Sequence, residues 1–504
     1  MNVKKIDKFR IFIIIAVIIT CILPYFIAYI KTPADSVFTG FVYETIDNNT
    51  YISKMSNAEK GWHFINNYTT GNDYGGYHFI FYIILGKLAL LFQIPYIWMF
   101  HISRTALSIC LVFALYNLLD NLELKGHQKN IIAFFVLFGG NQQWLLELAD
   151  VLTYGHVVNN GLMIVESMPS YSMLYIPHFI FVMIFQVLIA KHIYIYEENR
   201  LRNSLWISLF LSLICFVHPF IAVFNGIIFG LVIFINDIKN KQVNLKNILY
   251  ISLFAVFSLP YLIYSLYAFT HFDMLIKWQL QGESKFSSVS QFIIVGGLSM
   301  LAGVFVVITK WAWEGKRKIF SSWFASMLFL SMFPFNFQRR LWEGLFIPAF
   351  ILIGWFLSEK FKNRYITVVV ALFFAANTFW MAIQPLFMPK DYVMSYINYD
   401  FKECLDWINK NVGDDERILA NNIEANFIPA YSFKKVISGH HDESFNYQYW
   451  VDVWKTISET GDYEDVNKIE AEYYLANSSS NELNPEKFKL VYENGNFLLY
   501  RIKK

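Results

Sequence analysis

A series of long apolar segments constrains what this chain can fold into more than any other feature of its sequence. A helix needs roughly 17–25 mainly apolar residues to cross the hydrocarbon core of a membrane, and only a helix or a closed barrel can satisfy its backbone there. Eleven segments of about this length, several of them short, occur at residues 9–30, 98–119, 131–147, 173–196, 204–220, 221–236, 248–269, 291–309, 319–335, 342–357 and 365–388. The sequence therefore predicts a polytopic α-helical membrane protein with about eleven transmembrane helices.

Two apolar segments need a separate interpretation. Residues 204–236 form one apolar stretch that is interrupted at His218-Pro219, which fits either two short helices or one long helix kinked at the proline. Residues 79–94 are apolar but too short to span, so we expect a helix that lies at the membrane interface.

The composition agrees with a membrane environment and indicates two parts with different surroundings. Hydrophobic residues make up 56% and charged residues 16% of the chain, whereas about a quarter of positions are charged in soluble domains. The net charge of +2 divides into +10 for residues 1–390, with 29 basic and 19 acidic residues, and −8 for residues 391–504, with 12 and 20. We expect a membrane domain over 1–390 and a separate domain over 391–504.

The distribution of basic residues predicts the orientation, because short cytoplasmic loops carry the excess of lysine and arginine. With the N-terminus in the cytoplasm, every inner loop is basic, while the outer loop 31–78 is rich in acidic residues and the outer loop 148–172 has no lysine or arginine. We therefore expect a multi-pass protein of the plasma membrane whose acidic C-terminal domain lies outside the cell. That domain reads as α/β, with a helix near 401–411, a strand near 417–421 and a final hairpin that turns at Asn494-Gly495.

The first outer loop holds the sharpest group of reactive side chains. Glu44, Asp47 and Tyr51 are spaced so that one helical turn would place them on a common face. Carboxylates at this position can act as a general base or can hold a divalent cation such as Mg²⁺ or Mn²⁺. An ordinary solvated loop is the alternative, and the spacing by itself leaves metal dependence open.

The pair Arg339-Arg340 is the main basic feature of a short outer loop, and it runs against the charge bias of the topology. A guanidinium group binds phosphate through two parallel hydrogen bonds, so a lipid phosphate is the natural partner at this depth. The alternative is an arginine that extends to the head groups of the outer leaflet.

Three further residues are candidates for contact with a substrate. Glu166 and His178 lie at the end of the third outer loop, next to the start of a helix. Trp278, with Asp273 and Gln281 nearby, gives the aromatic and polar mixture that suits a sugar pocket. The sequence His440-His441-Asp442 lacks the ligand spacing of a zinc site, and no metal is expected there.

Together these features resemble the GT-C superfamily of integral-membrane glycosyltransferases, which use polyprenyl-phosphate sugars as donors. The resemblance implies that Asp47 is the catalytic carboxylate, with Glu44 as its substitute, and that Arg340 or Arg339 binds the donor phosphate. It further implies inverting transfer, at the outer face of the membrane, from a polyprenyl-phosphate sugar to a glycan, lipid or protein acceptor. Membrane lipid is an expected partner and nucleic acid is not. The chain departs from better-known branches because it lacks an Asp-Glu pair in the first loop.

A carrier of another class, a flippase for lipid-linked saccharides or a polysaccharide exporter, is the rival interpretation. Such a protein would show internal repeats or several ionisable residues near the middle of its helices. The sequence shows no such repeats, and Arg104 is the main charged residue inside a predicted helix.

Overall fold

The computed structural model describes residues 7–71, 76–152, 164–239, 249–282, 284–361, 363–387, 394–478 and 480–504. The chain divides into two compact units. Unit 1 consists of Met1–Pro24, His101–Tyr264 and Glu283–Gln384, and unit 2 consists of Tyr25–Phe100, Ser265–Gly282 and Pro385–Lys504. The C-terminal part of unit 2 begins close to the predicted start at residue 391, but this unit also includes the first outer loop. The predicted division into a membrane domain and an external domain stays a prediction.

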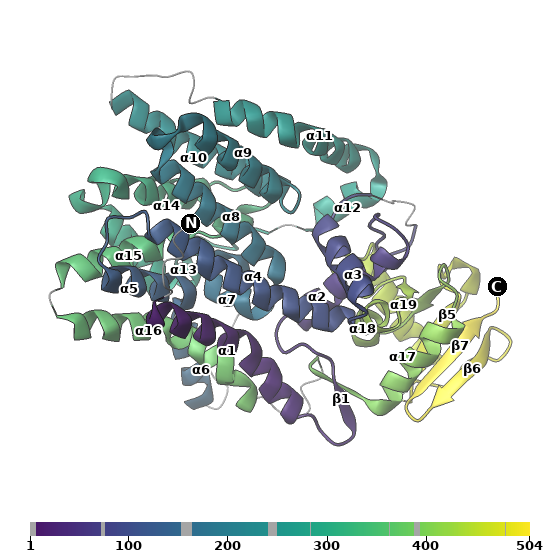
Figure 1. Cartoon of the computed structure of the whole chain (residues 1–504). Coiled ribbons are helices and arrows are strands. Elements are labelled where there is room, and N and C mark those ends of the chain that lie inside the picture. Colours follow the sequence, from purple (N-terminus) through teal and green to yellow (C-terminus); the bar gives the residue numbers. More distant parts are fainter. Residues whose placement is uncertain are drawn as a thin grey trace. The chain divides into compact units, whose positions relative to one another are not determined.

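The predicted apolar segments are mainly helical in the described part of the chain (Figure 1). The corresponding helices are α1 (Lys8–Ile30), α4 (Tyr96–Leu119), α5 (Gly126–Phe138), α6 (Gln143–Leu152), α8 (Pro177–Tyr194), α9 (Arg200–Cys215), α10 (Pro219–Lys239), α11 (Leu249–His271), α13 (Val289–Val307), α14 (Lys318–Leu330), α15 (Phe346–Lys360) and α16 (Arg364–Ile383). The polytopic α-helical class is therefore confirmed.

Where the structure describes the chain, fewer helices reach the length of a membrane crossing than the sequence predicts. Among the described residues, seven helices are long and apolar enough to span, and α5 with α6 makes an eighth if that bent pair is one span. The other segments form shorter helices, such as α9 with 16 residues and α14 with 13. The predicted number of eleven crossings stays a prediction.

The bend of 53° between α5 and α6 was not predicted from the sequence. The backbone groups released at the break find side-chain partners inside unit 1. The Ser170 hydroxyl donates to the carbonyl of Gly139 at 2.7 Å, and the Trp144 N–H donates to Asn377 Oδ1 at 2.8 Å. These bonds stabilise the break, because an unpaired backbone group in an apolar interior raises the free energy of the folded state.

The stretch 204–236 forms two helices, so the first of the two predicted alternatives is correct. Helix α9 ends at Cys215, and α10 begins at Pro219. Proline suits the first position of a helix, because the missing N–H has no partner within the helix there. His218 lies directly before this proline and so marks the junction.

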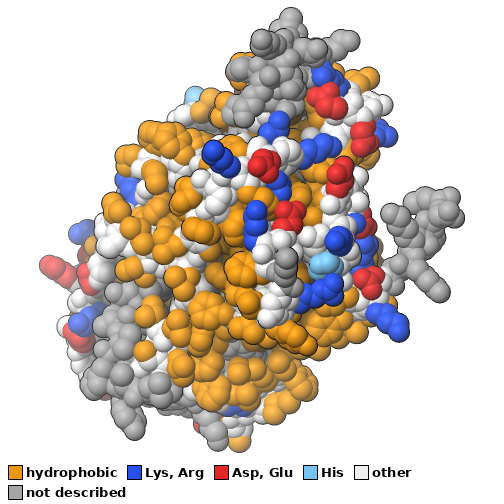
Figure 2. Space-filling view, turned by 90° about the vertical axis from the view of Figure 1, so that its left-hand side faces the viewer, with side chains coloured by type: hydrophobic (Ala, Val, Ile, Leu, Met, Phe, Trp, Pro, Cys, Tyr) orange, Lys and Arg blue, Asp and Glu red, His pale blue; other side chains and the backbone are white. Residues whose placement is uncertain are grey.

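Unit 1 exposes a surface of the kind that lipid would cover. Figure 2 shows hydrophobic side chains spread over much of one face, with charged side chains gathered in separate groups. Ile15 and Ile19 on α1 expose 51% and 52% of their surface, and Val369 on α16 exposes 64%. Contiguous apolar surface of this extent is unusual for a soluble monomer, and it fits a multi-pass membrane protein.

Unit 2 combines the predicted first outer loop, residues 31–78, with the C-terminal domain. The segment Tyr25–Phe100 contributes β1 (Ser36–Phe38), α2 (Thr45–Ser56) and α3 (Ile80–Phe92), and the segment Ser265–Gly282 contributes α12 (Asp273–Gln281). Strand β1 pairs antiparallel with β2 (Tyr396–Asn398), which joins the two ends of the unit. The helix expected over 79–94 is present as α3, while its position at the membrane interface stays a prediction.

The C-terminal domain is α/β, as expected (Figure 1). Its five-stranded sheet has the order β4-β3-β5-β7-β6, formed by β3 (Arg417–Leu419), β4 (Lys435–Val436), β5 (Tyr473–Asn477), β6 (Phe488–Asn494) and β7 (Phe497–Ile502). The pairs of β3 with β4 and β5 are parallel, and β7 is antiparallel to β5 and β6. The predicted hairpin is confirmed, with Gly495 at a positive φ of 51° in its turn.

Helices cover both faces of this sheet. Successive strand residues point to opposite faces, so neighbouring residues enter different hydrophobic cores. Ile418 packs in one hydrophobic core and Leu419 in the other. The first core includes side chains of α17 (Tyr399–Asn411) and α18 (Asn422–Tyr431), and the second includes those of α19 (Tyr447–Thr460). Helix α18 also packs against α2, so the sheet domain supports the first outer loop.

Glu424, in the first turn of α18, gives this domain a pH-dependent stability. Burial raises the pKa of its carboxyl from 4.5 to about 7. The native state therefore holds a proton that the unfolded state releases above about pH 4.5, so stability is full at low pH and falls as the pH rises through 7. The shift corresponds to at most about 3 kcal/mol.

We expect Glu424→Gln to remove this pH dependence, because the amide is neutral throughout. The apparent melting temperature of the purified wild type should fall between pH 5 and pH 8 more than that of the variant, and the variant should be the more stable protein at pH 8. A difference between the two proteins that does not change with pH would contradict this assignment.

Candidate active site

Asp47 lies in the first turn of α2, where the helix dipole stabilises a carboxylate. Its side chain is 43% exposed. Tyr51 follows one turn later and stacks on Tyr82 with 4.5 Å between the ring centroids. Glu44 precedes the helix as its N-cap residue and has a left-handed backbone with φ 45°. The predicted helical spacing therefore applies to Asp47 and Tyr51, whereas Glu44 lies outside the helix.

The carboxylate of Asp47 meets His440, which the sequence places 393 residues later. His440 Nε2 lies 2.9 Å from Asp47 Oδ1, and the histidine side chain is only 5% exposed. The backbone N–H of Asp442 donates to His440 Nδ1 at 3.2 Å. Because Nδ1 accepts this bond, a neutral imidazole carries its proton on Nε2. This N–H then donates a hydrogen bond to the Asp47 carboxylate. From its sequence context His440 is a candidate only for a zinc ligand, and its spacing does not fit one.

The segment that carries His440 is held by close backbone packing. A Cβ atom on Gly439 would lie 2.5 Å from the carbonyl oxygen of Ala425, so only glycine fits there. The Ser444 hydroxyl accepts the backbone N–H groups of Gly439 and His440 at 3.0 and 3.1 Å. Asn426 donates to the carbonyl of Gly439 at 3.1 Å. These contacts leave His440 little freedom to move relative to α18.

A buried ion pair ties the same segment to α2. Lys54 Nζ lies 2.6 Å from Glu443 Oε1, and the two side chains are 5% and 8% exposed. The ammonium group also lies 4.2 Å from the ring centroid of Phe79, within range of a cation–π interaction. Lys54 is two turns after Asp47 on α2, and Glu443 follows His440 by three residues. The pair therefore fixes both elements that carry the Asp47–His440 contact.

Helix α12 lies beside this segment within unit 2. Gln281 Nε2 donates to the carbonyl of Ser444 at 3.1 Å. The Trp278 ring packs edge-on against Phe79 at 5.6 Å and stacks near Phe269 at 6.0 Å. Trp278 and Gln281 were predicted as parts of a sugar pocket, and the structure brings them to the elements that surround Asp47. Their contact with a sugar stays a prediction.

The residues near Asp47 do not form a metal site of the usual kind. Within the described ranges, no three histidine, cysteine or acidic side chains come close enough together to hold a metal ion. Asp47 Oδ1 contacts the Nε2 of His440. A ring nitrogen that carries a proton is a hydrogen-bond donor and cannot coordinate a cation. The possible Mg²⁺ or Mn²⁺ at Asp47 therefore stays a prediction, and no step below uses a metal.

Unit 1 holds a second polar cluster, which contains the predicted Arg340, Glu166 and His178. Arg340 lies in the short 3₁₀ helix Gln338–Trp342, and its Nη1 is 3.2 Å from Glu166 Oε1. The Arg340 side chain is 41% exposed, whereas that of Glu166 is 9% exposed. Arg339 uses its backbone N–H to bind the carbonyl of Ser284 at 2.8 Å. Of the arginine pair, Arg340 is thus the residue built into the cluster.

Glu343 completes this cluster and was missed in the sequence. Its side chain is fully buried, and Oε2 lies 2.7 Å from His218 Nδ1. The His218 ring meets His178 edge-on, with 5.0 Å between the centroids. A signal was present, because Glu343 follows Arg340 by three residues in the same apolar loop, where an acidic residue needs a partner. His218, at the junction of α9 and α10, thus contacts both Glu343 and His178.

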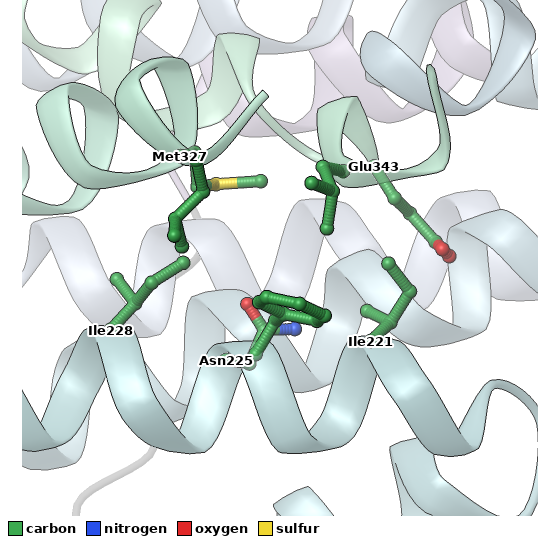
Figure 3. Close-up of a pocket in the computed structure, with 8 residues that line it drawn as sticks. Ile221, Asn225, Ile228, Met327 and Glu343 are labelled. Carbon is green, nitrogen blue, oxygen red and sulfur yellow. The ribbon is translucent and has the colours of Figure 1, made fainter. Parts of the chain in front are cut away.

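A small cavity adjoins Glu343 inside unit 1. It lies between α10, which supplies Ile221, Asn225 and Ile228, and α14, which supplies Met327 (Figure 3). Its volume of about 10 Å³ is close to the minimum for a single water molecule. It is too small for a sugar or a lipid phosphate, so it does not serve as the substrate site in this conformation.

Comparison with known proteins gives the fold its class. No protein-family model matches the sequence. No curated protein matches the sequence either. Among solved structures, the fold is similar to that of the arabinofuranosyltransferase AftD from Mycobacteria, with a TM-score of 0.59 and 10% identity over 97% of this chain and 40% of AftD. The apo oligosaccharyltransferase of Archaeoglobus fulgidus gives a TM-score of 0.55 at 10% identity, over 93% of this chain and 69% of that protein.

These similarities show that the chain shares the fold of the arabinofuranosyltransferase and the oligosaccharyltransferase, in agreement with the predicted resemblance in fold. ArnT from Cupriavidus metallidurans, solved with undecaprenyl phosphate bound, is similar over the whole length of both proteins. It gives a TM-score of 0.52 at 10% identity and covers 97% of each chain.

Proposed function

We propose that this chain is a GT-C-type glycosyltransferase that moves a sugar from a polyprenyl-phosphate donor to an acceptor at the outer face of the membrane. The observation that carries the proposal is the half-exposed carboxylate of Asp47, fixed at the start of α2 in a chain with a GT-C-like fold. The similar ArnT structure contains undecaprenyl phosphate, which supports a lipid-linked donor.

In this proposal Asp47 is the general base. It takes the proton from the acceptor hydroxyl while the acceptor oxygen forms a bond to the anomeric carbon of the sugar. The bond between that carbon and the phosphate oxygen breaks, and its electron pair leaves with the lipid phosphate. Because the base acts on the face opposite the leaving group, the anomeric configuration is inverted.

Arg340 has the complementary role of binding the donor phosphate. Its guanidinium is 41% exposed, and Glu166 holds it in place from one side. An arginine beside a departing phosphate stabilises the negative charge that develops there, and it does so more strongly where water is excluded.

The rival carrier function gains no support from Arg104. This residue is 1% exposed in α4. Its guanidinium donates to the carbonyl oxygens of Cys21, at 2.8 Å, and Met173. These bonds link the segments that carry Cys21 and Met173 inside unit 1, so a structural role accounts for this buried charge.

The test is transfer of label by the purified protein in lipid nanodiscs. The donors are radiolabelled undecaprenyl-phosphate glucose, galactose and mannose, and the acceptors are a panel of glycans, lipids and peptides. We expect label to move to at least one acceptor. The carrier function would be favoured by no transfer to any acceptor together with movement of the labelled donor across the bilayer of proteoliposomes.

Arg340→Gln should weaken donor binding by about 10- to 100-fold, because a charge-assisted hydrogen bond contributes about 1.5–3 kcal/mol. The measurement is the KM for the donor, together with the Kd of undecaprenyl phosphate in nanodiscs. The donor affinity of Arg340→Lys should lie between those of Arg340→Gln and the wild type, since lysine keeps the charge but loses the planar pair of donors.

Arg339→Gln is the matched control at the neighbouring position. It should change the Kd of undecaprenyl phosphate by less than Arg340→Gln does. The opposite order would transfer the phosphate-binding role to Arg339, and no effect from either variant would remove the arginine pair from the proposed site.

A further inference from the structure

We propose that His440, in the C-terminal domain, is a positioning residue that orients the carboxylate of Asp47 for proton transfer. The inference rests on the proposed function and deepens it, because it assigns to the sheet domain a part in the chemical step. Its basis is the contact of 2.9 Å between His440 Nε2 and Asp47 Oδ1 within unit 2.

The surroundings of His440 define which nitrogen carries the proton. Asp442 donates its backbone N–H to Nδ1, so Nε2 is the donor toward Asp47. A hydrogen bond to one ring nitrogen of a histidine determines whether the other nitrogen carries the proton. His440 can therefore hold the Asp47 carboxylate in a fixed orientation. His440 is nearly buried while Asp47 remains half-exposed, so the histidine supports the carboxylate from behind and leaves it accessible to an acceptor.

A hydrogen bond from a neutral donor makes a carboxylate a weaker base, since it stabilises the charged form. The benefit has to come from orientation. A base acts only when it lies within hydrogen-bond distance of the proton it removes, and a misplacement of about 1 Å can lower a rate by about 100-fold. The rigid segment around Gly439 and the Lys54–Glu443 ion pair supply the stiffness that such positioning needs.

The surrounding contacts distinguish His440 from its neighbour in the chain. His441 stacks on the His440 ring at 4.7 Å, but its side chain is 63% exposed and pairs with Asp442 at 3.4 Å. Two adjacent histidines thus differ in burial and in contact with Asp47. The pair provides a matched control, because each residue can be substituted singly and His440 is the member of the pair that contacts Asp47.

The test compares three substitutions of His440 in the full-length protein, with the nanodisc transfer assay as the readout. His440→Ala and His440→Asn should lower kcat by about 10- to 100-fold and leave the KM for the donor within about twofold. His440→Gln should recover most of the rate, because the glutamine amide nitrogen can reach the place of Nε2 and donate to Asp47. His441→Ala should keep the activity of the wild type.

Two results would overturn the proposal. If His440→Gln is as impaired as His440→Ala while both keep the melting temperature of the wild type, the donor at Nε2 has no special role. If His440→Ala adds its full loss to that of Asp47→Asn, the two residues do not act through one carboxylate, since residues that act as a unit are not additive.

The failure of this inference can be told apart from a failure of the proposed function. Full activity of Asp47→Asn would remove the base assignment and the role of His440 with it. An inactive Asp47→Asn with an unimpaired His440→Ala would leave the proposed function in place and refute only the role of His440.

Discussion

Asp47→Asn is expected to lower the rate of sugar transfer by about 10²- to 10⁴-fold, the range that general-base catalysis contributes. The asparagine has the same shape as the aspartate, so the contact with His440 Nε2 can persist through the amide oxygen. What the variant loses is the negative charge and the ability to accept a proton. The measurement is kcat for transfer of label from the lipid-linked donor.

Donor binding separates a catalytic effect from a general one. The Kd of undecaprenyl phosphate should stay within about threefold of the wild type, because Arg340 provides the proposed phosphate contact. Glu44→Gln is the control for the neighbouring carboxylate, which lies outside α2 as its N-cap residue. If Glu44→Gln is inactive and Asp47→Asn is active, the base is Glu44; if both are active, neither carboxylate is the base.

Lys54→Met is expected to destabilise the protein by about 3–5 kcal/mol, because it leaves the Glu443 carboxylate buried and unpaired. The ion pair has an N–O distance of 2.6 Å and almost no exposure, so solvent does little to compensate the remaining charge. For a unit of this size, such a loss lowers the apparent melting temperature by about 6–20 °C. Circular dichroism of the purified protein in detergent would measure it.

The double variant Lys54→Met/Glu443→Leu tests the physical reason. Removal of both charges takes away the desolvation penalty as well as the attraction, so the double variant should be more stable than Lys54→Met alone. The exposed pair Lys402–Asp406, at i and i+4 on α17, is a matched control. Lys402→Met should change stability by less than about 0.5 kcal/mol. Equal losses from Lys54→Met and Lys402→Met would contradict the argument.

Hydropathy and local pattern predicted most of the membrane helices. Length and uniform apolar character define α1 and α16, and neither signal depends on the rest of the structure. The break between α5 and α6 escaped prediction because its partners, Ser170 and Asn377, come from distant parts of the chain. Tertiary hydrogen bonds permit a bend that the local sequence would not favour.

The candidate site was predicted to a lesser extent, for a comparable reason. Asp47 was found because an acidic residue in the first outer loop is visible in the sequence, and Tyr51 because helical spacing links it to Asp47. His440 was tested only as a metal ligand, since no local pattern connects it to a carboxylate so far away. Glu343 was overlooked although its position beside Arg340 and within an apolar loop gave a usable signal.

The separation of Asp47 and His440 by 393 residues has a consequence for the order in which the site is made. A ribosome completes α2 early in synthesis, so Asp47 exists long before its imidazole partner has been translated. A product that stops before Gly439 contains the proposed base and all the described long apolar helices but lacks the residue that orients the carboxylate. We therefore expect the Asp47–His440 contact to form only after most of the chain is made, which makes completion of the polypeptide a condition for full activity.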